Sequence, residues 1–242
     1  TQISGQISWT PPNPTFLFGK LSARLERLYI PNAITQTNGI IPTDLPHDNP
    51  NGLPSLHVVT NDFQINNIHF GQLELIAHGS VEKNQSLWNM DKLLITHPAA
   101  TLKISGDWSM PAAQTTLKHT TLNFALNILD GGQLLTDIGV PKTLMGGKGD
   151  ITGDLHWHGS PLHVDYNSLD GHVTLNLQKG QLLRVDAGAA KLLGILSLQN
   201  LFHLAIFDLR GLASSGIPFN RVSATIDLNK GIAHSKDFKM ES

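Results

Sequence analysis

Alternation of apolar and polar residues is the main pattern along this chain. In "HVTLNLQ", Val173, Leu175 and Leu177 share one side of an extended segment, and polar residues occupy the other side. The segments "RVSATIDLN", "GQLELIAHGSVE" and "TLNFALNI" alternate in the same way. Gly, Asn, Asp or Pro residues separate such segments, as hairpin turns require. The pattern predicts about a dozen strands in a mainly β fold, a long, curved antiparallel sheet with one apolar and one polar face.

Two regions interrupt the alternation. Residues 31–55 contain five prolines, which predict a long loop between N-terminal strands in residues 1–30 and a main sheet in residues 56–242. Within the main sheet, residues 186–203 favour a helix. Its leucines spread around the whole circumference, so we expect it to be buried or to meet lipid. Polar residues interrupt it before it reaches the roughly 20 apolar residues that a membrane span needs.

Three short stretches share one order of residues. They read "ISGQISWTPP", "ISGDWSMP" and "ITGDLHWHGSP", and each runs from isoleucine through a hydroxyl residue, glycine and tryptophan to proline. The tryptophans are Trp9, Trp108 and Trp157. A catalytic site is rarely written three times, so the repetition indicates a structural unit.

The third copy also suggests a metal site. On a strand, Asp154, His156 and His158 share one face, and His163 is a possible third histidine ligand. The alternative is that these residues are the polar, solvent-facing half of an alternating strand. The other two copies have no histidine at the matching positions. We therefore expect no bound metal.

Composition narrows the classes of function. With 17 basic and 19 acidic residues the chain is close to neutral, which argues against nucleic acid as a partner. The absence of cysteine excludes disulfides and thiol catalysis. The glycine-rich "MGGKGD", residues 145–150, lacks the spacing of a phosphate loop and predicts a turn between strands. A long apolar face with only one helix to cover it favours a binding surface over an enzyme. We also expect no cofactor.

Longer stretches carry a resemblance to a known family. They are "LPSLHVVTNDFQINNIHFGQLEL", "ATLKISGDW", "GGKGDITGDLHWHGSP", "LDGHVTLNLQKGQLLRVDAGAAKLLGILSLQNL" and "FDLRGLASSGIPFNRVSATIDLNKGIAHSKDFKM". Together they resemble the YhdP branch of the AsmA-like, TamB-related family of bacterial envelope proteins, over roughly three quarters of the chain. The sequence departs from that pattern at residues 185–187, where an acid-proline-glycine turn is expected.

The resemblance implies a repeating β-groove that carries phospholipid between the inner and outer membranes. It implies a periplasmic fragment of a longer, inner-membrane-anchored protein of a Gram-negative bacterium, with phospholipid acyl chains, membranes and an outer-membrane or periplasmic protein as partners. The residues expected to line the groove are Ile104, Trp108, Phe124, Leu126, Leu155, Trp157, Val173, Leu175, Leu177, Ile226 and Leu228. Those expected on a helical lid over it are Leu192, Leu193, Leu196 and Phe202.

Two other classes of function remain open from the sequence. One is an adhesive β-solenoid that binds polysaccharide or protein, which predicts exposed aromatic platforms and a filled core. The other is a metal-dependent hydrolase built around His156, His158 and His163. Phospholipid that co-purifies with the chain would favour the groove over both.

Overall fold

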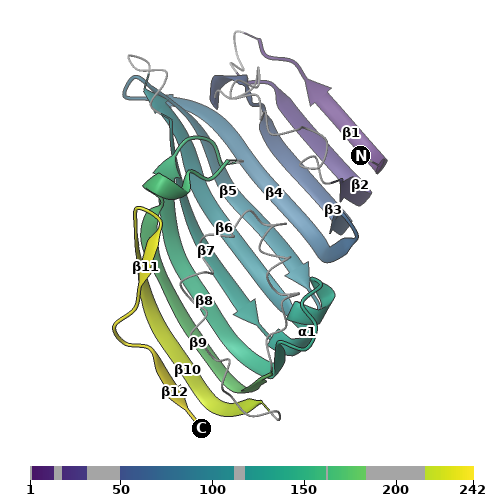
Figure 1. Ribbon diagram of the computed structural model, residues 1–242. Coiled ribbons are helices and arrows are strands. Elements are labelled where there is room, and N and C mark those ends of the chain that lie inside the picture. Colours follow the sequence, from purple (N-terminus) through teal and green to yellow (C-terminus); the bar gives the residue numbers. More distant parts are fainter. Residues whose placement is uncertain (1, 14–17, 32–49, 112–117, 162, 184–215) are drawn as a thin grey trace, which may run out of the picture. The chain divides into compact units, whose positions relative to one another are not determined.

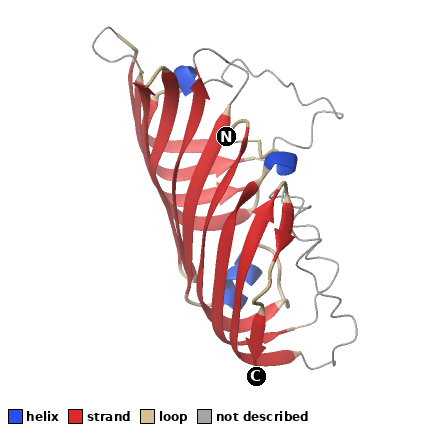
Figure 2. Ribbon diagram, turned by 90° about the vertical axis from the view of Figure 1, so that its left-hand side faces the viewer, coloured by secondary structure: helices blue, strands red, loops and turns tan. Residues whose placement is uncertain are grey.

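The structure is a computed structural model that describes residues 2–13, 18–31, 50–111, 118–161, 163–183 and 216–242. Strands make up most of this part of the chain (Figure 2). They are β1 (Gln2–Thr10), β2 (Lys20–Ile30), β3 (Ser55–Ile65), β4 (Ile68–Glu82), β5 (Gln85–His97), β6 (Ala100–Pro111), β7 (His119–Ile128), β8 (Leu144–His158), β9 (Asp170–Leu182), β10 (Ile217–Asn229), β11 (Ile232–His234) and β12 (Lys239–Glu241). The helical elements are α1 (Gly131–Asp137) and the single turns η2 (Pro50–Gly52) and η3 (Tyr166–Ser168).

The strands form one open 12-stranded sheet, so the predicted mainly β fold is confirmed. Neighbours along the chain are neighbours in the sheet from β1 to β11, and β12 pairs with β10 (Figure 1). By density of contacts the chain divides into two compact units. Unit 1 comprises residues 1–97, 103–122 and 159–162, and unit 2 comprises residues 98–102, 123–158 and 163–242.

One strand pair departs from the predicted antiparallel arrangement. Strands β2 and β3 are parallel, with Lys20 opposite Ser55 and Ile30 opposite Ile65. Parallel neighbours need a connection that returns from the end of one strand to the start of the next. The long proline-rich stretch after residue 30 supplies the length for that return. The alternation pattern does not reveal this one parallel pair, because strand direction depends on this nonlocal path.

The glycine-rich residues 145–150 do not form the predicted turn. They belong to β8, where Gly146 pairs with Gly180 and Gly149 pairs with Leu177 of β9. Gly146, Gly147 and Gly149 have positive φ angles, which glycine adopts without steric cost. The ladder to β9 therefore continues through a sequence that otherwise looks like a turn.

The three repeated stretches lie in β1, β6 and β8. The glycine of each has the same role, because a Cβ added there would collide with a carbonyl oxygen of the neighbouring strand. The glycines and the residues that carry those oxygens are Gly5 with Arg24, Gly106 with Thr121, and Gly153 with His172. Close strand approach thus explains why glycine recurs in the motif.

Candidate functional site

The apolar side chains of unit 2 form rows across three strands. Ile151 of β8 is opposite Leu175 of β9, which is opposite Ala224 of β10. The flanking rows follow the same register. We call the whole set the unit 2 apolar face, and its members on these strands are Ile151, Leu155, Val173, Leu175, Leu177, Val222, Ala224, Ile226 and Leu228.

Two positions of this face are glycines. Gly153 lies opposite Val173, and the ring of Phe124 from β7 lies over the space where a Gly153 side chain would be. Gly171 lies between Leu155 and Leu228. Most of the larger side chains of this face are half-buried, so apolar surface remains accessible among the described residues.

Unit 1 has an equivalent surface on five strands. Its central row runs from Ile7 through Ala23, Val58 and Leu75 to Leu93. The next row runs from Leu25 through Thr60 and Leu73 to Ile95. We call these two rows, with Leu21, Leu56, Ala77 and Met90 of the third, the unit 1 apolar face.

The segment just before β3 covers one end of the unit 1 apolar face. Leu53 packs against a buried cluster of Ala77, Trp88 and Trp108. The indole Nε1 of Trp88 donates a hydrogen bond to the carbonyl oxygen of Pro54 at 3.0 Å. This end of the face is therefore closed by the chain itself, whereas Val58, Leu75 and Leu93 are half-buried.

Comparison with known proteins identifies the family. A family model described as "YhdP protein" matches residues 1–242. The chain belongs to the YhdP family. It is also 29% identical over 100 residues to "Intermembrane phospholipid transporter YhdP" of Escherichia coli (strain K12), a stretch that covers 41% of this chain and 8% of that relative. No solved structure matches the chain.

The chain is thus compared with a YhdP relative many times longer than itself. It spans less than a tenth of that relative, so what the relative does as a whole does not transfer directly to this part. The family membership, in contrast, covers the complete sequence and agrees with the resemblance inferred from its residues.

The structure places the predicted groove residues on the apolar sides of their strands in both units. Ile104 and Trp108 belong to unit 1, and Phe124, Leu126, Leu155, Trp157, Val173, Leu175, Leu177, Ile226 and Leu228 belong to unit 2. Their contact with lipid stays a prediction. The predicted lid residues Leu192, Leu193, Leu196 and Phe202 lie outside the described residues.

The repeat tryptophans have two different environments. Trp108 and Trp157 are each 2% exposed, but Trp9 is 54% exposed and lies against Gly19. The indole Nε1 of Trp108 is buried with no acceptor among the described residues. A shared motif therefore does not give three equivalent anchors, because β1 lies at the edge of the sheet.

Several residues of the two faces were not among those expected to line the groove. The unit 2 rows also contain Ile151, Val222 and Ala224, and the unit 1 rows add Ile7, Val58 and Leu93. Alternation marks all of them as apolar positions. Only the register between strands shows which of them form common rows.

The opposite face of the sheet carries ion pairs. Lys92 Nζ lies 2.7 Å from Glu74 Oε2, and His78 Nδ1 lies 2.7 Å from Asp91 Oδ2. In unit 2, His172 lies between Asp154 and Asp227, with a nitrogen–oxygen distance of 3.6 Å to each. Asp154 is thus placed beside His172 of the neighbouring strand.

The described part of the chain shows no metal centre. Among these residues, no group of three or more histidines and acids is arranged to hold a metal ion. His156 and His158 both have other interactions. The structure therefore gives no support to the hydrolase alternative.

In the same described part, no helix is long and apolar enough to cross a membrane.

Proposed function

We propose that this chain binds phospholipid acyl chains on its unit 1 and unit 2 apolar faces, as one section of a bridge-like transporter between the inner and outer membranes. The observation that carries the proposal is that some apolar side chains in the cross-strand rows of each unit are only half-buried, among them Leu75 and Leu93 in unit 1 and Leu175 and Ile226 in unit 2. The name of the Escherichia coli relative, an intermembrane phospholipid transporter, supports it.

The physical basis is the cost of exposing hydrocarbon to water. Each exposed methylene of an acyl chain costs about 0.8 kcal/mol, so a lipid leaving a bilayer needs continuous apolar cover. Side chains such as Leu175 and Val173 supply that cover without directional bonds, so an acyl chain can slide along them. The head group stays in water. Such transport requires no catalytic residue.

The wider role follows from the same proposal. The protein would act in the periplasm of a Gram-negative cell and support the lipid balance and barrier function of the outer membrane. Three features remain predictions within it. They are the division into N-terminal strands, proline-rich loop and main groove, the lid at residues 186–203, and an outer-membrane or periplasmic protein partner.

The adhesive β-solenoid is the weaker alternative. A solenoid stacks successive coils as parallel strands. In this sheet the described strand pairs are antiparallel, with the exception of β2 and β3. The open sheet with partly exposed apolar rows fits a lipid-carrying surface better than a filled solenoid core.

Photo-crosslinking from adjacent positions of β9 tests the proposal. A photoreactive amino acid at Leu175 lies on the unit 2 apolar face, whereas the same probe at Thr174 points to the opposite face. In cells labelled with radioactive phosphate, we expect phospholipid to crosslink to the probe at Leu175 but not at Thr174. Equal labelling at both positions, or none at either, would contradict the proposal.

A further inference from the structure

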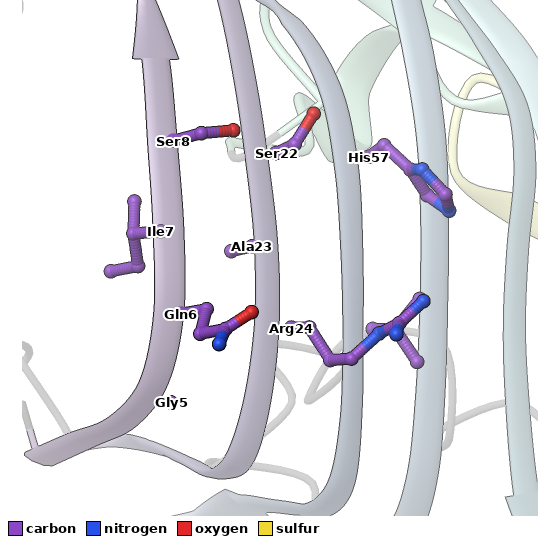
Figure 3. Close-up of a pocket in the computed structure, with 9 residues that line it drawn as sticks. Gly5, Gln6, Ile7, Ser8, Ser22, Ala23, Arg24 and His57 are labelled. Atoms are coloured by element: carbon purple, nitrogen blue, oxygen red, sulfur yellow. The ribbon is translucent and has the colours of Figure 1, made fainter.

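A shallow depression of about 650 Å³ lies at the β1 end of unit 1 (Figure 3). Its polar side chains lie on the face opposite the unit 1 apolar face, and Ile7 and Ala23 of that apolar face also contribute to its lining. Ser8, Ser22 and His57 form one row across β1, β2 and β3. Gln6 and Arg24 begin the next row, which continues to Val59.

The depression contains hydrogen-bond donors and no acid. Its lining offers the guanidinium group of Arg24, two hydroxyls, an amide and an imidazole, and its described lining residues include no Asp or Glu. Lys20 lies two residues before Ser22 on the same side of β2, which adds a second cation beside it. The local charge is therefore positive in a chain with a formal net charge of −2.

These polar groups differ from others on the same face because they have no partner among the described residues. Arg27 is bonded to Asp62 and Lys92 to Glu74, so their charges are neutralised within the sheet. No described residue forms an ion pair or hydrogen bond with the side chain of Arg24. The nearest acid on β2, Glu26, is approached by the hydroxyl of Ser4 at 3.5 Å.

We propose that this depression is a binding site for a phosphomonoester group. Side chains in neighbouring rows of a sheet lie about 7–8 Å apart along the diagonal, a gap that a phosphate bridges with hydrogen bonds of about 2.8 Å on each side. Arg24 supplies a planar fork for two phosphate oxygens. Ser8, Ser22 and His57 donate to the remaining oxygens. The site is independent of lipid on the apolar faces.

The test is a titration of the isotopically labelled 242-residue chain with inorganic phosphate, followed by amide NMR at constant ionic strength. We expect saturable shifts at Ser8, Ser22 and His57, and an affinity about tenfold weaker in Arg24→Gln, the usual effect of losing a hydrogen bond to a charged group. Arg24→Lys, which keeps the charge but not the fork, should lie between the two. Shifts without saturation would overturn the proposal.

Arg221→Gln is the matched control. Arg221 is an exposed cation on β10 in unit 2, so this variant changes the net charge equally but leaves the depression intact. We expect unchanged phosphate affinity. If Arg221→Gln weakens binding as much as Arg24→Gln, the phosphate senses only net charge and the site does not exist.

Vesicles distinguish two sources of the phosphomonoester. Co-sedimentation with phosphatidylcholine vesicles containing phosphatidic acid, lost in Arg24→Gln and absent with phosphatidylcholine alone, would assign a lipid head group. Saturable inorganic phosphate binding without co-sedimentation would assign a soluble phosphomonoester. If the chain binds neither inorganic phosphate nor vesicles with phosphatidic acid, the proposal is wrong.

Discussion

At the scale of single residues, Asp62 shows how the polar face is held together. Its carboxylate accepts hydrogen bonds from Arg27 Nε at 2.8 Å and from Gln64 Nε2 at 2.6 Å, and His69 Nδ1 lies 3.1 Å away. Burial alone would raise the pKa of Asp62, but the bonds from Arg27, His69 and Gln64 together lower it below its usual value. Since Arg27 and Asp62 are also opposite each other in the parallel pair, this group joins β2 to β3.

The lowered pKa of Asp62 predicts a specific pH dependence of stability. A carboxyl group with a lowered folded-state pKa stabilises the fold above its unfolded pKa, about 3.9, and loses that effect as pH falls through the folded value. We expect Asp62→Asn to reduce the free energy of unfolding by on the order of 1 kcal/mol at pH 7, because the bonds are partly exposed. Urea unfolding from pH 7 down to pH 3 should show this difference shrinking below about pH 4. A difference that stays constant to pH 3 would contradict the assignment.

At the scale of elements, α1 shows how a short helix is fitted to the sheet. Asp130 is its N-cap, and its carboxylate accepts a hydrogen bond from the backbone N–H of Gln133 at 3.0 Å. Gly131 and Gly132 follow, and a Cβ on either would crowd Leu144 at the start of β8. The two glycines therefore let the helix approach the strand closely, beside the ends of β7 and β8 (Figure 1).

The cap of α1 gives a second prediction. Asp130→Ala leaves backbone donors of the first turn without a partner, and such losses cost about 1 kcal/mol. We expect the urea midpoint of the chain to fall in Asp130→Ala and to stay near the original value in Asp130→Asn, because asparagine is an equally good N-cap. An equal fall in both variants would mean that the carboxylate acts through its charge instead.

The same elements show what the sequence can and cannot predict. Strand period alone correctly placed Val173, Leu175 and Leu177 on one face, because side chains alternate along every strand. It missed α1, because an Asp-Gly-Gly sequence is equally typical of a turn. The parallel direction of β3 and the partners Ile151 and Ala224 of Leu175 depend on register between distant segments. Local patterns do not encode that register.

At the scale of the whole molecule, each unit has its own apolar face. The two faces are built from separate strands, and each has its own buried anchors, Trp88 and Trp108 in unit 1 and Trp157 in unit 2. Lipid binding is therefore expected to be distributed over the chain. Changes on separate faces should add, because residues without shared partners contribute independently.

Single charges on the two faces test this distribution. Leu75→Asp puts a carboxylate between Val58 and Leu93 in unit 1, and Leu175→Asp puts one between Ile151 and Ala224 in unit 2. A charge next to an acyl chain is costly, so each variant should lower the phospholipid that co-purifies per chain, measured by mass spectrometry.

We expect each single variant to lose part of the lipid and the double variant to lose most of it. Thr174→Asp adds the same charge on the opposite face and should keep the original amount, while circular dichroism confirms that every variant retains its β signal. If either single substitution removes all the lipid, the two faces do not bind independently. If Thr174→Asp loses as much lipid as Leu175→Asp, the lipid is not held on the apolar face, because only the side of the strand distinguishes these two changes.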